Sequence, residues 1–140
     1  MYLPDVNFWL ALAFDSQAHH VLAKSWMQSA ALHSVCFCRV TQLGFLRLAT
    51  NRKAFPVDAV SMRESWQLYE DLFNDDRTAF SDEPDHLEAT LKVFTQLRTF
   101  STNVWTDAYL AAFAKTGNFE LVTFDKGFVQ YEGLRATILS

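Results

Sequence analysis

The strongest constraint on the fold is a strand pattern that ends at an acid. Residues 119–124 (FELVTF) are mostly apolar and β-prone, and Asp125 follows them directly. Asp5 similarly follows a short apolar run and Pro4, which belongs at a strand end because proline lacks the ladder donor. Further strand patterns at residues 34–40, 78–80 and 134–139 alternate with stretches of helical period. This alternation predicts an α/β fold with a central parallel β-sheet flanked by helices.

A third acid, Asp107, lies in the first turn of a predicted helix that starts in the stretch 106–112 (TDAYLAA) and ends at residues 116–118 (TGN), a C-cap signal. Ligands of parallel α/β sheets bind beyond the carboxyl ends of the strands. Asp5 and Asp125 lie at such ends, and the helix of Asp107 leads into the strand at 119–124. We therefore expect the three carboxylates to converge on one edge of the sheet.

Three converging carboxylates repel one another unless a proton or a cation neutralises them. Oxygen ligands without histidine or cysteine suit Mg²⁺, with Mn²⁺ as an alternative, rather than zinc. Such an ion polarises a phosphoryl oxygen and activates a water, so the predicted chemistry is phosphodiester hydrolysis. Asp5 and Asp107 would ligate the metal most directly, and Asp125 would either ligate it through water or orient the attacking water. Each acid alone also has an ordinary explanation as a helix cap, a first-turn acid or a turn residue.

Three polar residues could support these acids. Asn7 could hydrogen-bond a metal-bound water, and Thr106 or Thr123 could orient an aspartate.

The net charge of −4 hides an asymmetry along the chain. Residues 16–57 contain no Asp or Glu, whereas residues 58–88 are strongly acidic. A cationic face and ordinary solvated side chains are both compatible with the basic stretch. The candidates for contacts with nucleic-acid phosphates are Arg39, Arg47, Arg52 and Lys53.

A chain of 140 residues with half its residues apolar predicts a single domain, 1–140, with a real core. No apolar run reaches 18 residues and the N-terminus lacks a basic region, so we expect a cytoplasmic protein with no membrane segment. Cys36 and Cys38 share one face of a predicted strand, which suits two buried thiols better than a disulfide.

Local signals predict where several helices begin. Ser16 is expected to cap the helix that runs to about residue 31, Thr41 the helix at 42–49, and Asp58 the next one. A further helix is expected to start at residues 82–84 (DEP).

Four stretches together resemble the PIN-domain ribonucleases, in particular the VapC toxins of bacterial toxin–antitoxin pairs. They are residues 3–13 (LPDVNFWLALA), 40–48 (VTQLGFLRL), 106–112 (TDAYLAA) and 121–128 (LVTFDKGF). The resemblance implies a PIN fold, Mg²⁺-dependent cleavage of RNA, a homodimer, and inhibition by a small antitoxin encoded beside the toxin. It places the acids of the family's site on Asp5, Asp107 and Asp125.

The chain departs from this pattern at Gln42, because many members carry Glu after the threonine of the second stretch. A neutral amide can hydrogen-bond a metal-bound water but offsets no ionic charge, so we expect weaker binding of any second metal. This departure keeps open a second hypothesis, a weak or inactive PIN-like module that binds RNA or a partner. A receiver-like phosphoacceptor domain fits less well, because the chain has no paired acid beside Asp5.

Overall fold

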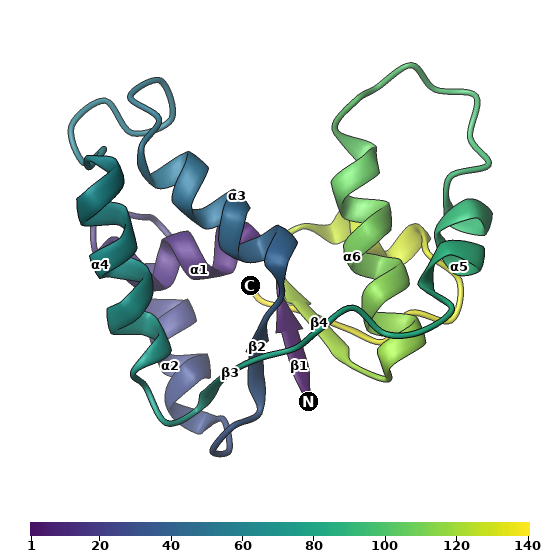
Figure 1. Ribbon diagram of the computed structural model, residues 1–140, viewed down its shortest axis with the longest axis horizontal. Helices are drawn as coiled ribbons and strands as arrows, with labels where there is room; N and C mark the ends of the chain where they lie inside the picture. Colours follow the sequence, from purple (N-terminus) through teal and green to yellow (C-terminus); the bar gives the residue numbers. More distant parts are fainter.

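Five parallel strands form one sheet at the centre of the molecule, in the order β3-β2-β1-β4-β5 (Figure 1). The computed structural model describes all residues, Met1–Ser140. The strands are β1 (Tyr2–Pro4), β2 (Val35–Phe37), β3 (Thr78–Phe80), β4 (Glu120–Thr123) and β5 (Ala136–Ile138). The helices are α1 (Val6–Ala13), α2 (His20–Ser29), α3 (Arg39–Ala49), α4 (Met62–Phe73), α5 (Leu87–Phe94) and α6 (Val104–Gly117), with a 3₁₀ helix, η1, at Lys126–Gln130. The predicted α/β fold is confirmed.

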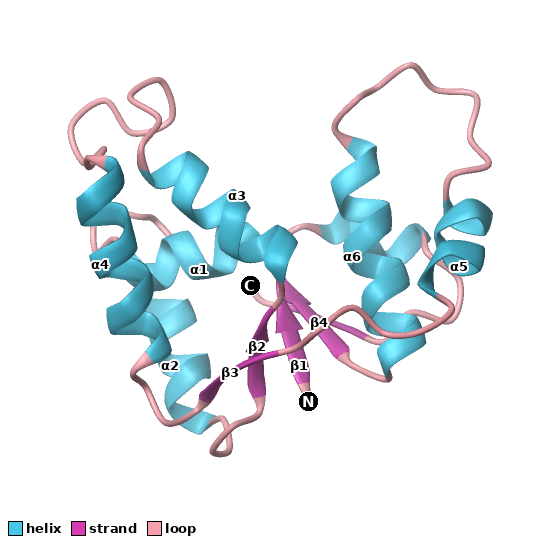
Figure 2. Ribbon diagram, viewed as in Figure 1, coloured by secondary structure: helices cyan, strands magenta, loops and turns pink.

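Helices cover both faces of the sheet. Helices α1–α4 lie on one side of the strands, and α5 and α6 lie on the other (Figure 2). Strand residues alternate between the two layers as the two-residue period requires. Leu121 packs with the α5–α6 cluster, whereas its neighbour Val122 packs with the α1–α4 cluster. Both faces of β4 are buried at Leu121 and Val122, so two apolar residues stand side by side there instead of alternating with polar ones.

Two of the predicted helix caps are wrong because the residues concerned bind each other. The Ser16 hydroxyl donates to Asp58 at 2.6 Å, so neither side chain caps a helix. His19 stands at the N-cap of α2, and Ser61 caps α4 by accepting from the Glu64 backbone N–H at 3.1 Å. Ser16 and Asp58 are good capping residues in isolation, but their contact across 42 positions uses both side chains, and α2 is left without a side-chain cap.

Helix α3 begins three residues earlier than predicted, and β2 is correspondingly shorter than residues 34–40. Cys38 occupies the N-cap, and Thr41 lies inside the first turn, where its hydroxyl accepts from the Cys38 backbone N–H at 3.0 Å. Helix α5 begins later than predicted, after His86, whose backbone is left-handed with φ of 67°.

Other local predictions are confirmed. Helix α6 ends at Gly117, and Asn118 follows in the left-handed conformation typical of a helix C-cap. Cys36 and Cys38 are buried free thiols. None of the helices combines the length and the apolar character needed to cross a membrane.

Candidate active site

Asp5 is a buried carboxylate at the junction of β1 and α1. It caps α1, with Oδ1 accepting from the Phe8 backbone N–H at 3.0 Å. Its second oxygen, Oδ2, accepts from the hydroxyl of Thr123 at the end of β4. The side chain is only 6% exposed, and burial raises the pKa of Asp5 to about 6, against the opposing hydrogen bonds from Thr123 and Phe8. The charges of Asp107 and Asp125 add to the rise in this pKa. The fold therefore holds one carboxylate in a place that disfavours its charge.

Asp107 faces the same cavity as Asp5. This cavity has a volume of about 550 Å³ and lies between the start of α1, the end of α3 and the start of α6. Burial, followed by the charge of Asp125, raises the pKa of Asp107. We call the cavity shared by Asp5 and Asp107 the acid cavity. Its lining residues are Asp5, Val6, Asn7, Arg47, Leu48, Thr102, Asn103, Thr106, Asp107 and Leu110.

Asp125 is more exposed and lies in an adjoining cavity of about 450 Å³. Its Oδ1 accepts from the Gly127 backbone N–H at 2.8 Å, which fixes the start of η1. Asn7 and Leu48 line both cavities, so the two hollows adjoin at these residues.

The three predicted ligands are neighbours, but they do not form a preassembled metal cluster. No group of three or more His, Cys, Asp or Glu side chains lies close enough together to hold an ion. The donor set nevertheless suits a hydrated divalent cation, because magnesium keeps several waters and needs only one or two carboxylates. The raised pKa values of Asp5 and Asp107 show carboxylates without a cationic partner, which is the electrostatic setting that a cation relieves.

Two of the three supporting residues lie at the acid cavity. Asn7 and Thr106 line it with exposed side chains. Thr123 is fully buried and joins two acids, because its oxygen donates to Asp5 and accepts from the Asp125 backbone N–H at 3.0 Å.

Gln42 lines neither of the two cavities. Its side-chain oxygen accepts from the Arg39 guanidinium, and its amide lies beside Tyr69 of α4. The face of α3 that meets the acids carries other residues, because Gly44 packs against Val6 and Arg47 lines the acid cavity. We therefore leave Gln42 out of the proposed site.

The four candidate RNA-binding cations are not gathered in one patch. Only Arg47 lines the acid cavity, where it is exposed and forms no ion pair. Arg39 lies over the ring of Phe80, with its guanidinium carbon 5.0 Å from the ring centre. Arg52 and Lys53 are exposed in the turn after α3.

Tyr131 lies near the acids and was not predicted from the sequence. Tyr131 follows η1, is 5% exposed, and has a buried hydroxyl without a hydrogen-bond partner. Its pKa is raised by burial and then by the charges of Asp107 and Asp125. No sequence signal marks it, because only the fold of η1 brings its ring toward these acids.

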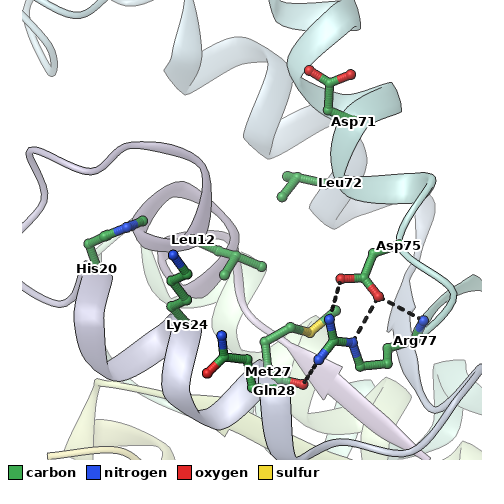
Figure 3. A pocket seen from close by; sticks show the side chains of 9 residues that line it. All are labelled: Leu12, His20, Lys24, Met27, Gln28, Asp71, Leu72, Asp75 and Arg77. Carbon is green, nitrogen blue, oxygen red and sulfur yellow. Dashed lines mark hydrogen bonds and ion pairs between the residues drawn. The ribbon is translucent and has the colours of Figure 1, made fainter.

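A separate groove of about 290 Å³ lies between α1, α2 and α4 (Figure 3). Its walls include Lys24 and Asp71, and Arg77 lies at one end, paired with Asp75 at 2.9 Å. The Arg77 guanidinium also donates to the Met27 carbonyl at 3.2 Å. None of the predicted catalytic acids lies in this groove.

Comparison with known proteins assigns the chain to a family. The model of the PIN domain matches residues 2–134. The chain belongs to the PIN-domain family. This PIN domain is 43% identical over its whole length to ribonuclease VapC41 of Mycobacterium tuberculosis, covering 99% of that protein. It is also 30% identical to ribonuclease VapC38 of the same species, over 91% of this chain and 86% of that one. The predicted resemblance to PIN-domain ribonucleases of the VapC type is thus confirmed.

Solved structures support the same fold for this PIN domain. VapC20 of M. tuberculosis, a toxin that cleaves the sarcin–ricin loop, matches with a TM-score of 0.68 at 18% identity, over 94% of this chain and 95% of that one. A chain of VapBC2 from Rickettsia felis, bound to a DNA fragment from its promoter, matches with a TM-score of 0.68 at 11% identity, over 99% and 98%.

Proposed function

We propose that this protein is a metal-dependent endoribonuclease that hydrolyses RNA phosphodiester bonds, and the toxin of a type II toxin–antitoxin pair. The observation that carries the proposal is the buried Asp5 carboxylate beside Asp107 in an open cavity. Burying a carboxylate that has no cationic partner disfavours its ionised form, and a cation bound beside it would relieve that cost. The names of the VapC ribonucleases to which the chain is similar support the same activity.

Asp5 and Asp107 would hold Mg²⁺, or Mn²⁺, directly, and Asp125 would act through a metal-bound water. The bound ion would supply a polarised phosphoryl oxygen and an activated water. The Thr123 hydroxyl fixes the Asp5 carboxylate, so the chain supplies an oriented ligand before RNA arrives. Asn7 at the cavity rim offers an amide to a metal-bound water, and Arg47 offers a charge to an RNA phosphate.

The test is a cleavage assay on structured RNA with Mg²⁺, Mn²⁺ or a chelator. Wild type and Asp15→Asn, a control acid that is exposed on the loop after α1, should cleave in either metal. Asp5→Asn and Asp107→Asn should lose metal-dependent cleavage. Equal, metal-independent background from all four proteins would refute the nuclease. RNA binding that persists without cleavage would instead identify the chain as a binding module.

We further propose a small cognate antitoxin, a homodimer and a cytoplasmic location. Solved neighbours that are VapBC complexes support the antitoxin. The groove between α1, α2 and α4 is our candidate docking surface, because apolar Leu12 and Leu72 lie in it beside side chains of both charges (Figure 3). Co-expression with a neighbouring short reading frame, followed by light scattering of the purified complex, tests both the antitoxin complex and the homodimer. A toxin that purifies alone and as a monomer would contradict them.

A further inference from the structure

A column of three aromatic rings runs from the core to the surface beside Asp125. Phe8, which is fully buried, stacks on Phe124 with ring centres 6.3 Å apart and an interplanar angle of 23°. Phe124 in turn stacks on His19, at 4.3 Å and 14°. His19 is exposed, so the column ends in a flat ring at the surface.

The His19 ring has no structural task in the chain beyond this stack. It occupies the N-cap of α2 but makes no capping hydrogen bond. The neighbouring His20 differs, because its Nδ1 lies 2.8 Å from the Ala11 carbonyl oxygen and ties α2 to α1. An exposed ring that is held parallel to a second ring, without a hydrogen bond of its own, offers a free face and free ring nitrogens.

This ring opens onto the cavity that holds Asp125. The cavity measures about 450 Å³, within the range of small-molecule sites, and adjoins the acid cavity at Asn7. Beside the His19 ring, its polar lining includes the amides of Asn7 and Gln17. Amides donate and accept, which is what the edge of a nucleobase requires.

We propose that this cavity is a nucleobase subsite, in which an unpaired base of the RNA stacks on His19 while its edge meets Gln17 and Asn7. The proposal rests on the proposed nuclease function and adds a site for the nucleotide next to the cleaved phosphate. A base is uncharged, so it can occupy this cavity without charge repulsion from Asp125. Unpaired bases in RNA are commonly bound by stacking on aromatic side chains, including histidine.

Binding to a short, unstructured, fluorescein-labelled RNA tests the subsite without cleavage. The protein carries Asp107→Asn, and anisotropy gives the dissociation constant. Adding His19→Ala should weaken binding roughly 5- to 150-fold, the range expected for the loss of one base–aromatic stack. His19→Phe keeps the ring and should retain most of the affinity. Trp66→Ala removes an exposed aromatic ring from α4 and should bind as the parent does.

A second variant changes Phe124, the ring on which His19 stacks. Phe124→Leu keeps apolar volume but removes the ring on which His19 stacks, so it should weaken RNA binding in the same direction. In the cleavage-competent protein, His19→Ala should raise KM with kcat retained, and should change which nucleotide flanks the cut.

The two proposals fail in different ways. A wild type that binds RNA but does not cut it refutes the nuclease and leaves the subsite to the binding experiment. Equal RNA affinity of His19→Ala, Trp66→Ala and their parent overturns the subsite, even if cleavage is normal. Weakened antitoxin binding by His19→Ala with unchanged RNA affinity also overturns it, because a protein segment would then occupy the cavity.

Discussion

Replacing Asp5 by Asn should stabilise the metal-free protein, and the gain should depend on pH. Asparagine matches aspartate in shape and keeps an acceptor for the Phe8 N–H, but it carries no charge. Its NH2 group replaces the oxygen that accepts from Thr123, and the loss of that hydrogen bond is a cost that does not vary with the ionisation of residue 5. The pKa of Asp5 rises from 3.8 to about 6 on folding, chiefly because burial disfavours the ionised carboxylate. At about 1.4 kcal/mol for each pH unit, the ionised group lowers the stability of the fold by roughly 3 kcal/mol.

The sign follows from proton binding. The native chain holds the Asp5 proton more tightly than the unfolded chain does, so the favourable contribution is complete below pH 3.8. It is lost as the pH rises through the native pKa of about 6, and does not change further above it. Relative to wild type, Asp5→Asn should therefore gain up to about 3 kcal/mol in unfolding free energy between about pH 4 and pH 7.

Urea unfolding in the presence of a chelator measures this difference at several pH values. The exposed Asp15→Asn variant controls for the removal of one negative charge, and unchanged m values verify that the unfolded states are comparable. Added Mg²⁺ should then stabilise wild type and leave Asp5→Asn nearly unaffected, because only wild type gains the ligand. A stability difference that stays constant with pH would refute the conclusion that burial raises the pKa of Asp5.

Three further outcomes follow from individual contacts. Thr123→Val removes the hydroxyl bound to Asp5, so cleavage should fall roughly 10- to 100-fold while the circular dichroism spectrum is unchanged; an unaltered rate would contradict the orienting role. Gly44→Ala places a Cβ 2.7 Å from Val6 Cγ2 and should lower the free energy of unfolding by about 1–3 kcal/mol, measured by thermal or urea unfolding. Adding Val6→Ala should recover the lost stability. Arg47→Ala should weaken RNA binding and reduce the slope of log K against log salt by about 1, unless Arg47 makes no phosphate contact.

Sequence patterns predicted the sheet well because each central strand is buried on both faces. The mostly apolar and β-prone character of residues 119–124 reflects that burial directly, and no distant partner had to be known. Helix starts were harder, since Ser16 and Asp58 are both good caps in isolation. Their mutual hydrogen bond spans 42 positions, and local sequence contains no trace of it.

The same distinction applies to the site. Asp5 and Asp125 could be found because strand ends in a parallel sheet face one edge, a rule that needs only secondary structure. The same rule could not predict whether Arg47 or Gln42 faces the acids, because the rotation of α3 about its axis depends on the close contact of Gly44 with Val6. His19 was out of reach for the same reason, as its position follows from a ring that lies more than a hundred residues away.

Thr123 explains how two of the acids are set relative to each other across the paired strands β1 and β4. One hydroxyl oxygen donates its single proton to Asp5 and accepts from the Asp125 backbone N–H. Because the strands pair in parallel, Pro4 lies opposite Val122, and the residues that follow each strand emerge side by side. The hydroxyl then fixes the orientation of Asp5, while the sheet fixes where Asp125 begins. Serine at this position would keep both hydrogen bonds but free the χ1 angle that β-branching restricts, so the geometry of the acids depends on threonine in particular.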